Sequence, residues 1–132
     1  MRILIVEDDF TSRKVLQKIL SKYGECDIAV NGEEAVEAFK LALEEAAPYS
    51  LICMDIMMPI IDGQQALQRI RNIERERNLN YDQEVKAIMI TALSDLQNVN
   101  EAFSKGWTNS YITKPIDSSA LIEEIRELGL IE

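Results

Sequence analysis

The chain has 132 residues, of which 47% are hydrophobic and 28% charged, as is typical of one soluble globular domain with its own apolar core. Its net charge of −9 argues against a direct nucleic-acid partner, because phosphate backbones recruit lysine and arginine. No apolar run approaches the ~20 residues of a membrane span and the amino terminus lacks a signal-peptide cleavage site, so we expect a cytoplasmic protein without membrane insertion.

Short apolar runs alternate with longer amphipathic stretches along the chain. Residues 3–6 (ILIV) predict a buried strand, and residues 11–22 carry apolar side chains at helical spacing. We expect a second strand over residues 26–30, followed by a helix over residues 33–46 whose first turn is acidic. The third strand, residues 50–54, is apolar in the manner of a parallel sheet covered on both faces.

The second half of the chain continues this alternation after the loop DIMMPIIDG. Residues 64–77 predict an amphipathic helix, and residues 85–90 predict the fourth strand. A weaker helix is expected over residues 95–105, the fifth strand over residues 109–113 and a last helix over residues 118–128. This (βα)5 order predicts an α/β fold, in which one doubly wound domain is built on a parallel sheet.

The sequence contains no histidine, which excludes Ser-His-Asp and Cys-His catalysis and histidine-ligated zinc. Its two cysteines, Cys26 and Cys53, lie in apolar runs and form no CxxC motif. We interpret them as reduced core residues, with a buried disulfide as the alternative. Any chemistry must therefore come from carboxylates, hydroxyls, lysine and a hard metal ion.

Polar side chains stand at the ends of four predicted strands. Glu7 and Asp8 follow the first strand, and Asp55 follows the third. Thr91 ends the fourth strand, and Lys114 ends the fifth. Ligands of such sheets bind outside the carboxyl ends of the strands, so we expect these side chains to meet at one edge. Clustered carboxylates at a partly buried edge need a cation or raised pKa values, because they repel one another and resist desolvation.

These residue types fit the binding of a phosphoryl group. Two or three carboxylates with room for water form the hard oxygen site that Mg²⁺ prefers. Lys114 would add a fixed positive charge and Thr91 a hydroxyl, which together would bind phosphoryl oxygens. Asp55 is central among the strand ends and is the natural nucleophile, giving an aspartyl phosphate.

Four motifs, LIVEDD, ICMDIMMPIIDG, MITA and SYITKPI, occur in this order across essentially the whole chain. Together they resemble the receiver domain of bacterial two-component response regulators. The resemblance implies a flavodoxin-like five-stranded parallel sheet with strand order 2-1-3-4-5 and a receiver domain over residues 1–132. We expect no output domain and a non-enzymatic signalling protein that acts by protein contact, with a receiver cut from a longer protein as the alternative.

The resemblance also implies roles for the acidic residues. Asp55 would be phosphorylated by a sensor histidine kinase or a histidine phosphotransfer protein. Asp8 would bind Mg²⁺ directly and Glu7 through water, with Asp55 and the backbone carbonyl of Met57 completing the protein's share of the metal site. Asp9 would be a bystander, although an alignment shifted by one residue would favour the pair Asp8 and Asp9.

A switch follows from the same resemblance. Thr91 and Lys114 would bind the phosphoryl oxygens, and Tyr111 would be the switch aromatic that moves inward with Thr91. The peptide bond between Lys114 and Pro115 would be cis. The surface that changes its affinity for a downstream protein target would be formed by residues 95–105, 109–113 and 118–128.

Several positions depart from the family pattern. Asn109 and Ser110 stand where DNA-binding members often carry paired acids, so we do not expect the dimer that those acids support. Met57 and Leu93 occupy the positions that tune dephosphorylation, and neither can orient an attacking water, which predicts a long-lived phosphoryl group. Trp107 stands where a small residue is common, and it either packs under the helix over residues 95–105 or anchors a partner.

Each of these residues also has a structural interpretation when it is taken alone. The acids after the first strand could form a solvated turn with a helix cap, and Lys114 could be a surface lysine. Two other functions would require different sequence features. A haloacid-dehalogenase-like phosphatase would carry DxDx[TV] at the first strand, where this chain reads EDDFT. A pseudo-receiver, which binds partners without phosphorylation, would be expected to lack Asp55, Lys114 or the acid pair.

Overall fold

A computed structural model describes residues 1–132 and contains one sheet of five parallel strands in the order β2-β1-β3-β4-β5. The strands are β1 (Arg2–Val6), β2 (Glu25–Ala29), β3 (Leu51–Asp55), β4 (Lys86–Thr91) and β5 (Ser110–Thr113). The helices are α1 (Phe10–Leu20), α2 (Gly32–Glu44), α3 (Gly63–Glu76), α4 (Leu96–Ser104) and α5 (Ser118–Glu127). A short 3₁₀ helix, η1 (Leu93–Asp95), precedes α4.

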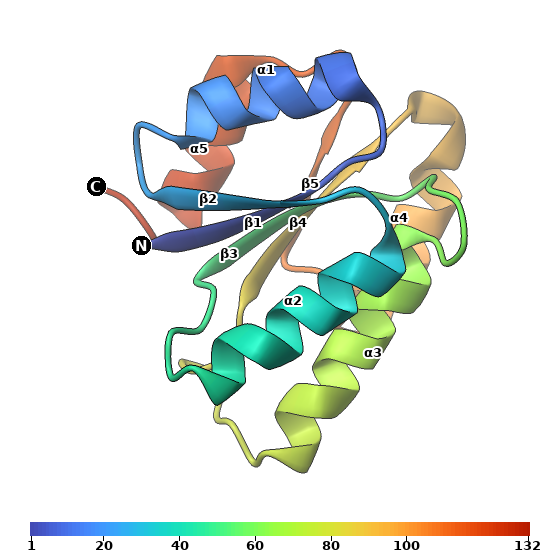
Figure 1. Ribbon diagram of the computed structural model, residues 1–132. Coiled ribbons are helices and arrows are strands. Elements are labelled where there is room, and N and C mark those ends of the chain that lie inside the picture. Colours follow the sequence, from blue (N-terminus) through green and yellow to red (C-terminus); the bar gives the residue numbers. More distant parts are fainter.

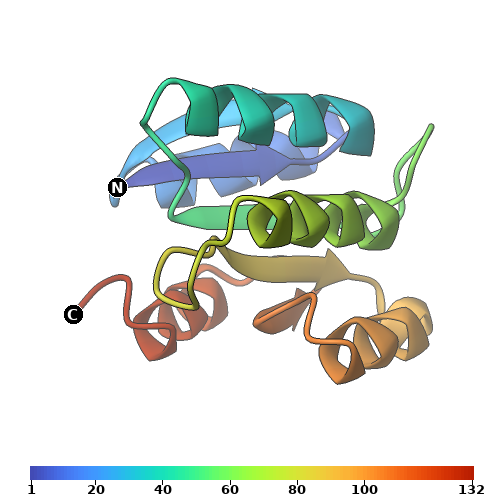
Figure 2. The ribbon, with the colours of Figure 1, turned by 90° about the horizontal axis from the view of Figure 1, so that it is seen from below.

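The helices form two layers on the sheet. In Figure 1, α1 and α5 lie above the sheet, whereas α2 and α3 lie below it. Figure 2 shows the molecule from below, with α2 and α3 in front of the strands and α4 farther along the sheet. The predicted (βα)5 order and strand order 2-1-3-4-5 are confirmed, and every strand and helix ends within two residues of its predicted position.

The sheet separates the apolar core into layers. Along β1, Leu4 and Val6 pack with α2 and α3, whereas Ile3 and Ile5 pack with α1 and α5. A smaller cluster lies between β4, α3 and α4. The central strands β1, β3 and β4 are covered on both faces, which explains why their sequences are nearly all apolar instead of alternating.

Side-chain caps determine where helices begin at the strand ends. The Asp9 carboxylate accepts a hydrogen bond from the Ser12 amide at 2.8 Å, so α1 begins at Phe10. The first turn of α3 has a capping box, in which Asp62 and Gln65 each accept a hydrogen bond from the other's backbone amide. These caps fix the directions in which the chain leaves β1 and the loop after β3.

The two ends of the sheet differ in what they carry. All strands run in the same direction, so their carboxyl ends lie together at one end of the molecule. The amino and carboxyl termini lie at the opposite end in both views (Figures 1 and 2). Loops after the strands can therefore form a site that neither terminus approaches.

Three smaller expectations concern the cysteines, the tryptophan and the membrane. Cys26 is half-buried and Cys53 is buried, and both thiols are free, as predicted. Trp107 packs partly buried beside the cluster of α3, α4 and β4, with the Lys105 ammonium 5.3 Å from its ring, which favours the packing interpretation. No helix combines the length and apolar character that crossing a bilayer requires.

Candidate functional site

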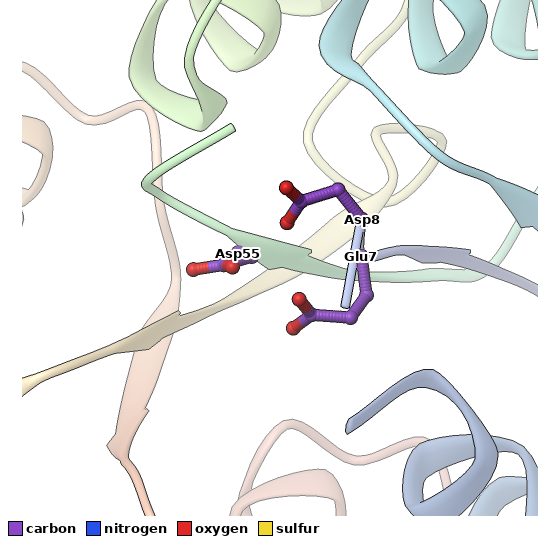
Figure 3. Close-up of side chains that lie close together, drawn as sticks. All are labelled: Glu7, Asp8 and Asp55. Atoms are coloured by element: carbon purple, nitrogen blue, oxygen red, sulfur yellow. The ribbon is translucent and has the colours of Figure 1, made fainter. Parts of the chain in front are cut away.

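Three carboxylates meet at the carboxyl ends of β1 and β3. Glu7 and Asp8 directly follow β1, and Asp55 is the last residue of β3. One oxygen from each lies within 4.8 Å of the others. Figure 3 shows the three side chains around a common space, with Asp55 approaching from β3 and the other two from the end of β1. The chain thus gathers these acids as the strand pattern predicts.

The loop after β3 closes tightly beneath Asp55. The amide of Gly63 donates a hydrogen bond to the Ile56 carbonyl at 2.8 Å, which brings the start of α3 back to the strand end. A Cβ atom at position 63 would collide with the backbone carbonyl of Asp55. Only glycine therefore permits this approach, and the approach holds Asp55 at the edge of the sheet.

Lys114 brings a cation to the carboxylates. Its Nζ atom lies 3.2 Å from Asp55 Oδ2 and 3.5 Å from Glu7 Oε2. Its backbone amide donates to the Thr91 carbonyl at 2.8 Å, and the peptide bond to Pro115 is cis. Burial alone would lower the pKa of Lys114, but the carboxylates of Asp55 and Glu7 raise it, so the ammonium stays charged.

Glu7 is the acid with the least favourable surroundings. Its side chain is fully buried, and Oε2 has no hydrogen-bond partner, although Oε1 accepts from the Asp9 amide at 3.1 Å. Burial, followed by repulsion from the Asp55 carboxylate, raises the pKa of Glu7 to about 7. A buried carboxylate oxygen that accepts no hydrogen bond, and that shares the Lys114 ammonium with Asp55, suits a further contact with a hard cation.

Asp8 and Asp9 have different surroundings. Asp8 is exposed and contributes an oxygen to the three-acid cluster. The carboxylate of Asp9 instead caps α1 by accepting from the Ser12 amide. In the structure it is therefore Glu7, and not Asp9, that lies with Asp8 in the cluster. This agrees with the alignment that pairs Glu7 with Asp8 and not with the shifted alignment that pairs Asp8 with Asp9.

The other predicted site residues lie nearby but do not all face the acids. Thr91 is buried at the end of β4, and its hydroxyl donates to the Ala92 carbonyl at 2.9 Å. The Met57 amide donates to Asp55 Oδ1 at 3.3 Å, while the Met57 side chain is exposed. Tyr111 is partly exposed, and its ring meets Phe103 edge-on with centroids 5.8 Å apart.

The contact between Tyr111 and Phe103 is a feature that the sequence patterns did not indicate. Phe103 lies on α4 and Tyr111 on β5, and both line a groove of about 610 Å³ on the α4–β5–α5 side. The available signal was an aromatic residue near the end of an amphipathic helix, directly before an edge strand. Hydrophobic spacing assigns such a residue to the core, whereas Phe103 is 41% exposed.

Comparison with known proteins identifies the family. Residues 3–126 match the model of the response regulator receiver domain. The chain belongs to the response regulator receiver domain family. The receiver domain is 35% identical over 126 residues to the chemotaxis protein CheY of Treponema pallidum, covering 94% of this chain and 79% of that protein.

Other relatives are much longer than this chain. The peroxide stress-activated histidine kinase mak2 of Schizosaccharomyces pombe is 36% identical over 98% of this chain, which spans 5% of the kinase. The osmosensing histidine protein kinase SLN1 of Saccharomyces cerevisiae is 31% identical over 88% of this chain, which spans 9% of that kinase. The receiver domain thus matches a small part of each kinase.

Solved structures give the same fold. A CheX–CheY–BeF3–Mg²⁺ complex from Borrelia burgdorferi matches with a TM-score of 0.82 and 27% identity, covering all of this chain and 90% of that one. The complex of the Saccharomyces cerevisiae phosphotransfer protein Ypd1 with the receiver domain of Ssk1 matches with a TM-score of 0.81 and 30% identity, covering 98% and 88% of the chains. The chain is a receiver domain with the same fold as these proteins.

Proposed function

We propose that this receiver domain accepts a phosphoryl group on Asp55 from a sensor histidine kinase or a histidine phosphotransfer protein. The observation that carries this proposal is the meeting of three carboxylates with one lysine at the carboxyl edge of the sheet. Asp55 is the acid whose carboxylate contacts both the Lys114 ammonium and the Met57 amide. It is therefore the oxygen nucleophile best held for attack on phosphorus.

We infer that Mg²⁺ binds between Glu7, Asp8, Asp55 and the backbone carbonyl of Met57. Two features support this assignment: the Oε2 atom of Glu7 accepts no hydrogen bond, and the donor set consists of oxygen atoms alone. A CheY relative was crystallised with Mg²⁺ and BeF3, which also supports it. When bound, Mg²⁺ would neutralise charge on the phosphoryl oxygens.

The transfer step needs few groups from the protein. A carboxylate oxygen of Asp55 attacks phosphorus, and the phosphorus–nitrogen bond of the donor phosphohistidine breaks as its electron pair returns to the imidazole nitrogen. Lys114 stays protonated and stabilises negative charge beside Asp55. The domain acts as a phosphoacceptor, so turnover is limited to accepting the group and losing it slowly to water.

The switch that we propose follows from the positions of Thr91, Lys114 and Tyr111. A phosphoryl group on Asp55 would attract the Lys114 ammonium and draw the Thr91 hydroxyl away from the Ala92 carbonyl. Tyr111, which rests outward against Phe103, would follow Thr91 and change the groove between α4 and α5. A downstream protein that prefers one arrangement then binds with a different affinity, limited by the difference in contact energy.

Exposed apolar side chains around the acids support a protein as the phosphodonor. Phe10 after β1, Met57 after β3 and Leu93 after β4 are 62%, 60% and 69% exposed. Side chains of this kind around a polar centre are typical of a docking surface. The related Ssk1 receiver was crystallised with a histidine phosphotransfer protein. We propose such a partner in the cytoplasm of a bacterial cell.

Intact-mass measurement tests the proposal. The protein is incubated with Mg²⁺ and acetyl phosphate, beside Asp55→Asn, Asp62→Asn and a sample containing EDTA. We expect one added phosphoryl group in the wild type and in Asp62→Asn, a matched loop aspartate that caps α3. Asp55→Asn and the EDTA sample should show none. No addition to the folded wild type, or addition that survives Asp55→Asn, would contradict the proposal and favour a pseudo-receiver or another acceptor.

A further inference from the structure

The outer side of β2 is an open sheet edge. β2 pairs only with β1. On that side, the Glu25 amide donates to the Met1 carbonyl and the Ala29 carbonyl accepts from the Glu7 amide, at the two ends of the paired region. Backbone groups of alternate residues point to the same side of a parallel strand, so those of Cys26 and Ile28 point away from β1. An edge of this kind can pair with another extended chain.

A groove runs beside this edge. Its volume is about 450 Å³, and it lies between β2, α2 and the loop after β3, with Ile28, Ala38 and Ile60 as apolar lining. Ile28 is 36% exposed and Ile60 is 69% exposed. Natural edges are usually protected by charge, proline or a covering element. β2 carries the acids Glu25 and Asp27 in its first half, but its fourth residue, Ile28, is an exposed isoleucine on the side of the groove. The groove is therefore a surface on which a partner would bury apolar area.

Ile60 has a backbone conformation that disfavours its side chain. Its φ angle is +73°, in the left-handed region that β-branched residues avoid. The exposed side chain gains little from packing within this chain. A partner that covers Ile60 would supply that packing.

Charge decides which partner fits. The α2 side of the groove carries Glu33, Glu34 and Glu37, of which Glu37 forms an ion pair with Lys40 at 3.6 Å. A second copy of this chain would bring the same carboxylates and a further net charge of −9, so the two copies would repel. A segment rich in lysine or arginine is instead attracted.

We propose that the groove between β2 and α2 binds an extended, basic segment of a partner protein. The segment pairs with the open edge of β2, places its cations beside the α2 carboxylates and covers Ile60. This is β-strand addition, in which backbone hydrogen bonds give affinity and alternate side chains give specificity. The surface is separate from the phosphoryl site, since no carboxylate of that site lines the groove.

The first experiment uses a short fluorescent peptide of alternating lysine and valine, measured by fluorescence anisotropy with the whole chain. We expect saturable binding with one peptide per chain, and amide shift changes in the NMR spectrum confined to residues 25–38 and the loop around Ile60. A peptide with glutamate in place of lysine should not bind, and a proline at the central valine should weaken binding. Absence of saturable binding, or shift changes centred on β5, would overturn the proposal.

Variants separate binding from folding. Ile60→Gly should weaken peptide binding about tenfold while leaving thermal stability equal or higher, since glycine accepts the positive φ. Glu37→Lys should also weaken binding about tenfold, with the loss reduced by salt. The matched controls are Leu93→Gly, which is equally exposed, and Glu101→Lys on α4, and both should bind normally. Unchanged peptide binding in Ile60→Gly and Glu37→Lys would overturn the proposal. An equal loss of peptide binding in the two control variants would also overturn it.

Asp55→Asn keeps this inference distinct from the proposed function. The groove should bind the peptide equally in the wild type and in Asp55→Asn, because Asp55 does not line it. A loss of peptide binding in this variant would overturn the separation of the two surfaces. Failure of phosphorylation with intact peptide binding would contradict only the phosphoacceptor assignment.

Discussion

Glu7 is the residue at which the electrostatic cost of the site is concentrated. It is fully buried, it lies 3.5 Å from one shared lysine, and its Oε2 is the buried side-chain oxygen left without a hydrogen bond. We predict that Glu7→Gln makes the metal-free protein more stable by about 1–2 kcal/mol, because it removes a poorly solvated charge. Urea unfolding in EDTA measures this gain.

The same substitution should weaken the response to Mg²⁺. Because Glu7→Gln removes a negative ligand, the stability that Mg²⁺ adds should be smaller than in the wild type. Asp8→Asn is the matched control for burial. Because Asp8 is exposed, this substitution should raise the stability of the metal-free protein less than Glu7→Gln does. If Glu7→Gln is less stable than the wild type in EDTA, the prediction is wrong, because Lys114 then compensates the buried charge of Glu7 without a metal ion.

Met57 and Leu93 bear on how long the phosphoryl group lasts. Both side chains are exposed and apolar, 60% and 69% respectively, and neither can hold a water in line with phosphorus. We predict that Met57→Asn combined with Leu93→Glu accelerates phosphate loss by about tenfold, since polar side chains there can orient the attacking water. The decay of phosphorylated protein after removal of the donor measures the rate. Ile60→Asn, an exposed residue of the same loop, is the control, and an unchanged or slower rate in the double variant would refute the idea.

At the scale of elements, a buried ion pair joins α3 to the strands. Arg71 pairs with Glu74 at 2.7 Å and also donates to the backbone carbonyls of Val85 and Trp107 and to the Asn109 side chain. The Glu74 carboxylate accepts from the Val85 amide at 2.7 Å. One guanidinium therefore connects the start of β4 with the chain that leads into β5.

Removing one partner of this pair should be costly. We predict that Arg71→Met destabilises the protein by about 3–5 kcal/mol, because Glu74 stays buried without its cation. Arg71→Met combined with Glu74→Leu should recover part of the loss, and Arg75→Met on the exposed side of α3 should change little. Urea unfolding of the full double-mutant cycle measures the coupling, and additive single losses would contradict it.

A second contact joins β1, β2 and the segment before β3. The Tyr49 hydroxyl donates to Asp27 at 2.7 Å, and the Arg2 guanidinium lies 4.7 Å from the Tyr49 ring centroid. Burial, followed by the hydrogen bond to Asp27, raises the pKa of Tyr49 well above its usual value. Tyr49 therefore keeps its proton in the folded protein at a pH where the unfolded chain has lost it.

This difference predicts how stability depends on alkaline pH. Above the ordinary tyrosine pKa of about 10 the unfolded state binds fewer protons than the folded state, so stability falls as pH rises. We predict that Tyr49→Phe is about 1 kcal/mol less stable at neutral pH, through loss of the hydrogen bond, and shows a shallower alkaline decline. Tyr81→Phe, at a residue that is 68% exposed, should keep the wild-type decline. Chemical unfolding between pH 8 and pH 11 measures both slopes, and an equal slope in Tyr49→Phe would contradict the assignment.

The sequence could predict the helices but not this polar interior. Leu67, Ile70, Arg71 and Glu74 have the spacing of one buried stripe, and all four are buried in α3. Apolar spacing does not include the two charged residues, so it indicates the buried face of α3 only through the apolar members of that face. An opposite-charge pair three residues apart inside an apolar stripe is the signal that was available.

Over the whole molecule, the net charge of −9 makes the folded state sensitive to ions. We predict that MgCl2 stabilises the protein more than NaCl at equal ionic strength, because only Mg²⁺ fits the three-acid cluster. At a Mg²⁺ concentration about 100 times the Kd, the added stability should be roughly 2.7 kcal/mol. Thermal unfolding in matched salts measures the difference. Asp8→Asn should reduce it, and equal effects of the two salts would argue against a specific site.

The fold was predictable because its determinants are local and repeated. Five apolar runs separated by amphipathic helices permit few arrangements, and the four motifs added the strand order. The gathering of Glu7, Asp8, Asp55 and Lys114 followed from their positions at strand ends. Side-chain directions were not predictable in this way. The contact between Tyr111 and Phe103 depends on tertiary packing, and the positive φ angle of Ile60 depends on the geometry of its loop. The periodicity of apolar residues encodes neither.

Both termini lie at the end of the sheet opposite the carboxylates (Figure 1). The molecule can therefore be attached through either terminus, to a biosensor chip or by an affinity tag, while the carboxylates of Glu7, Asp8 and Asp55 face the solution. A fluorophore attached at one terminus would report tumbling without obstructing a donor protein. An immobilised sample would consequently remain open to a phosphodonor, so association could be timed on the same tethered molecules before and after Asp55 is modified.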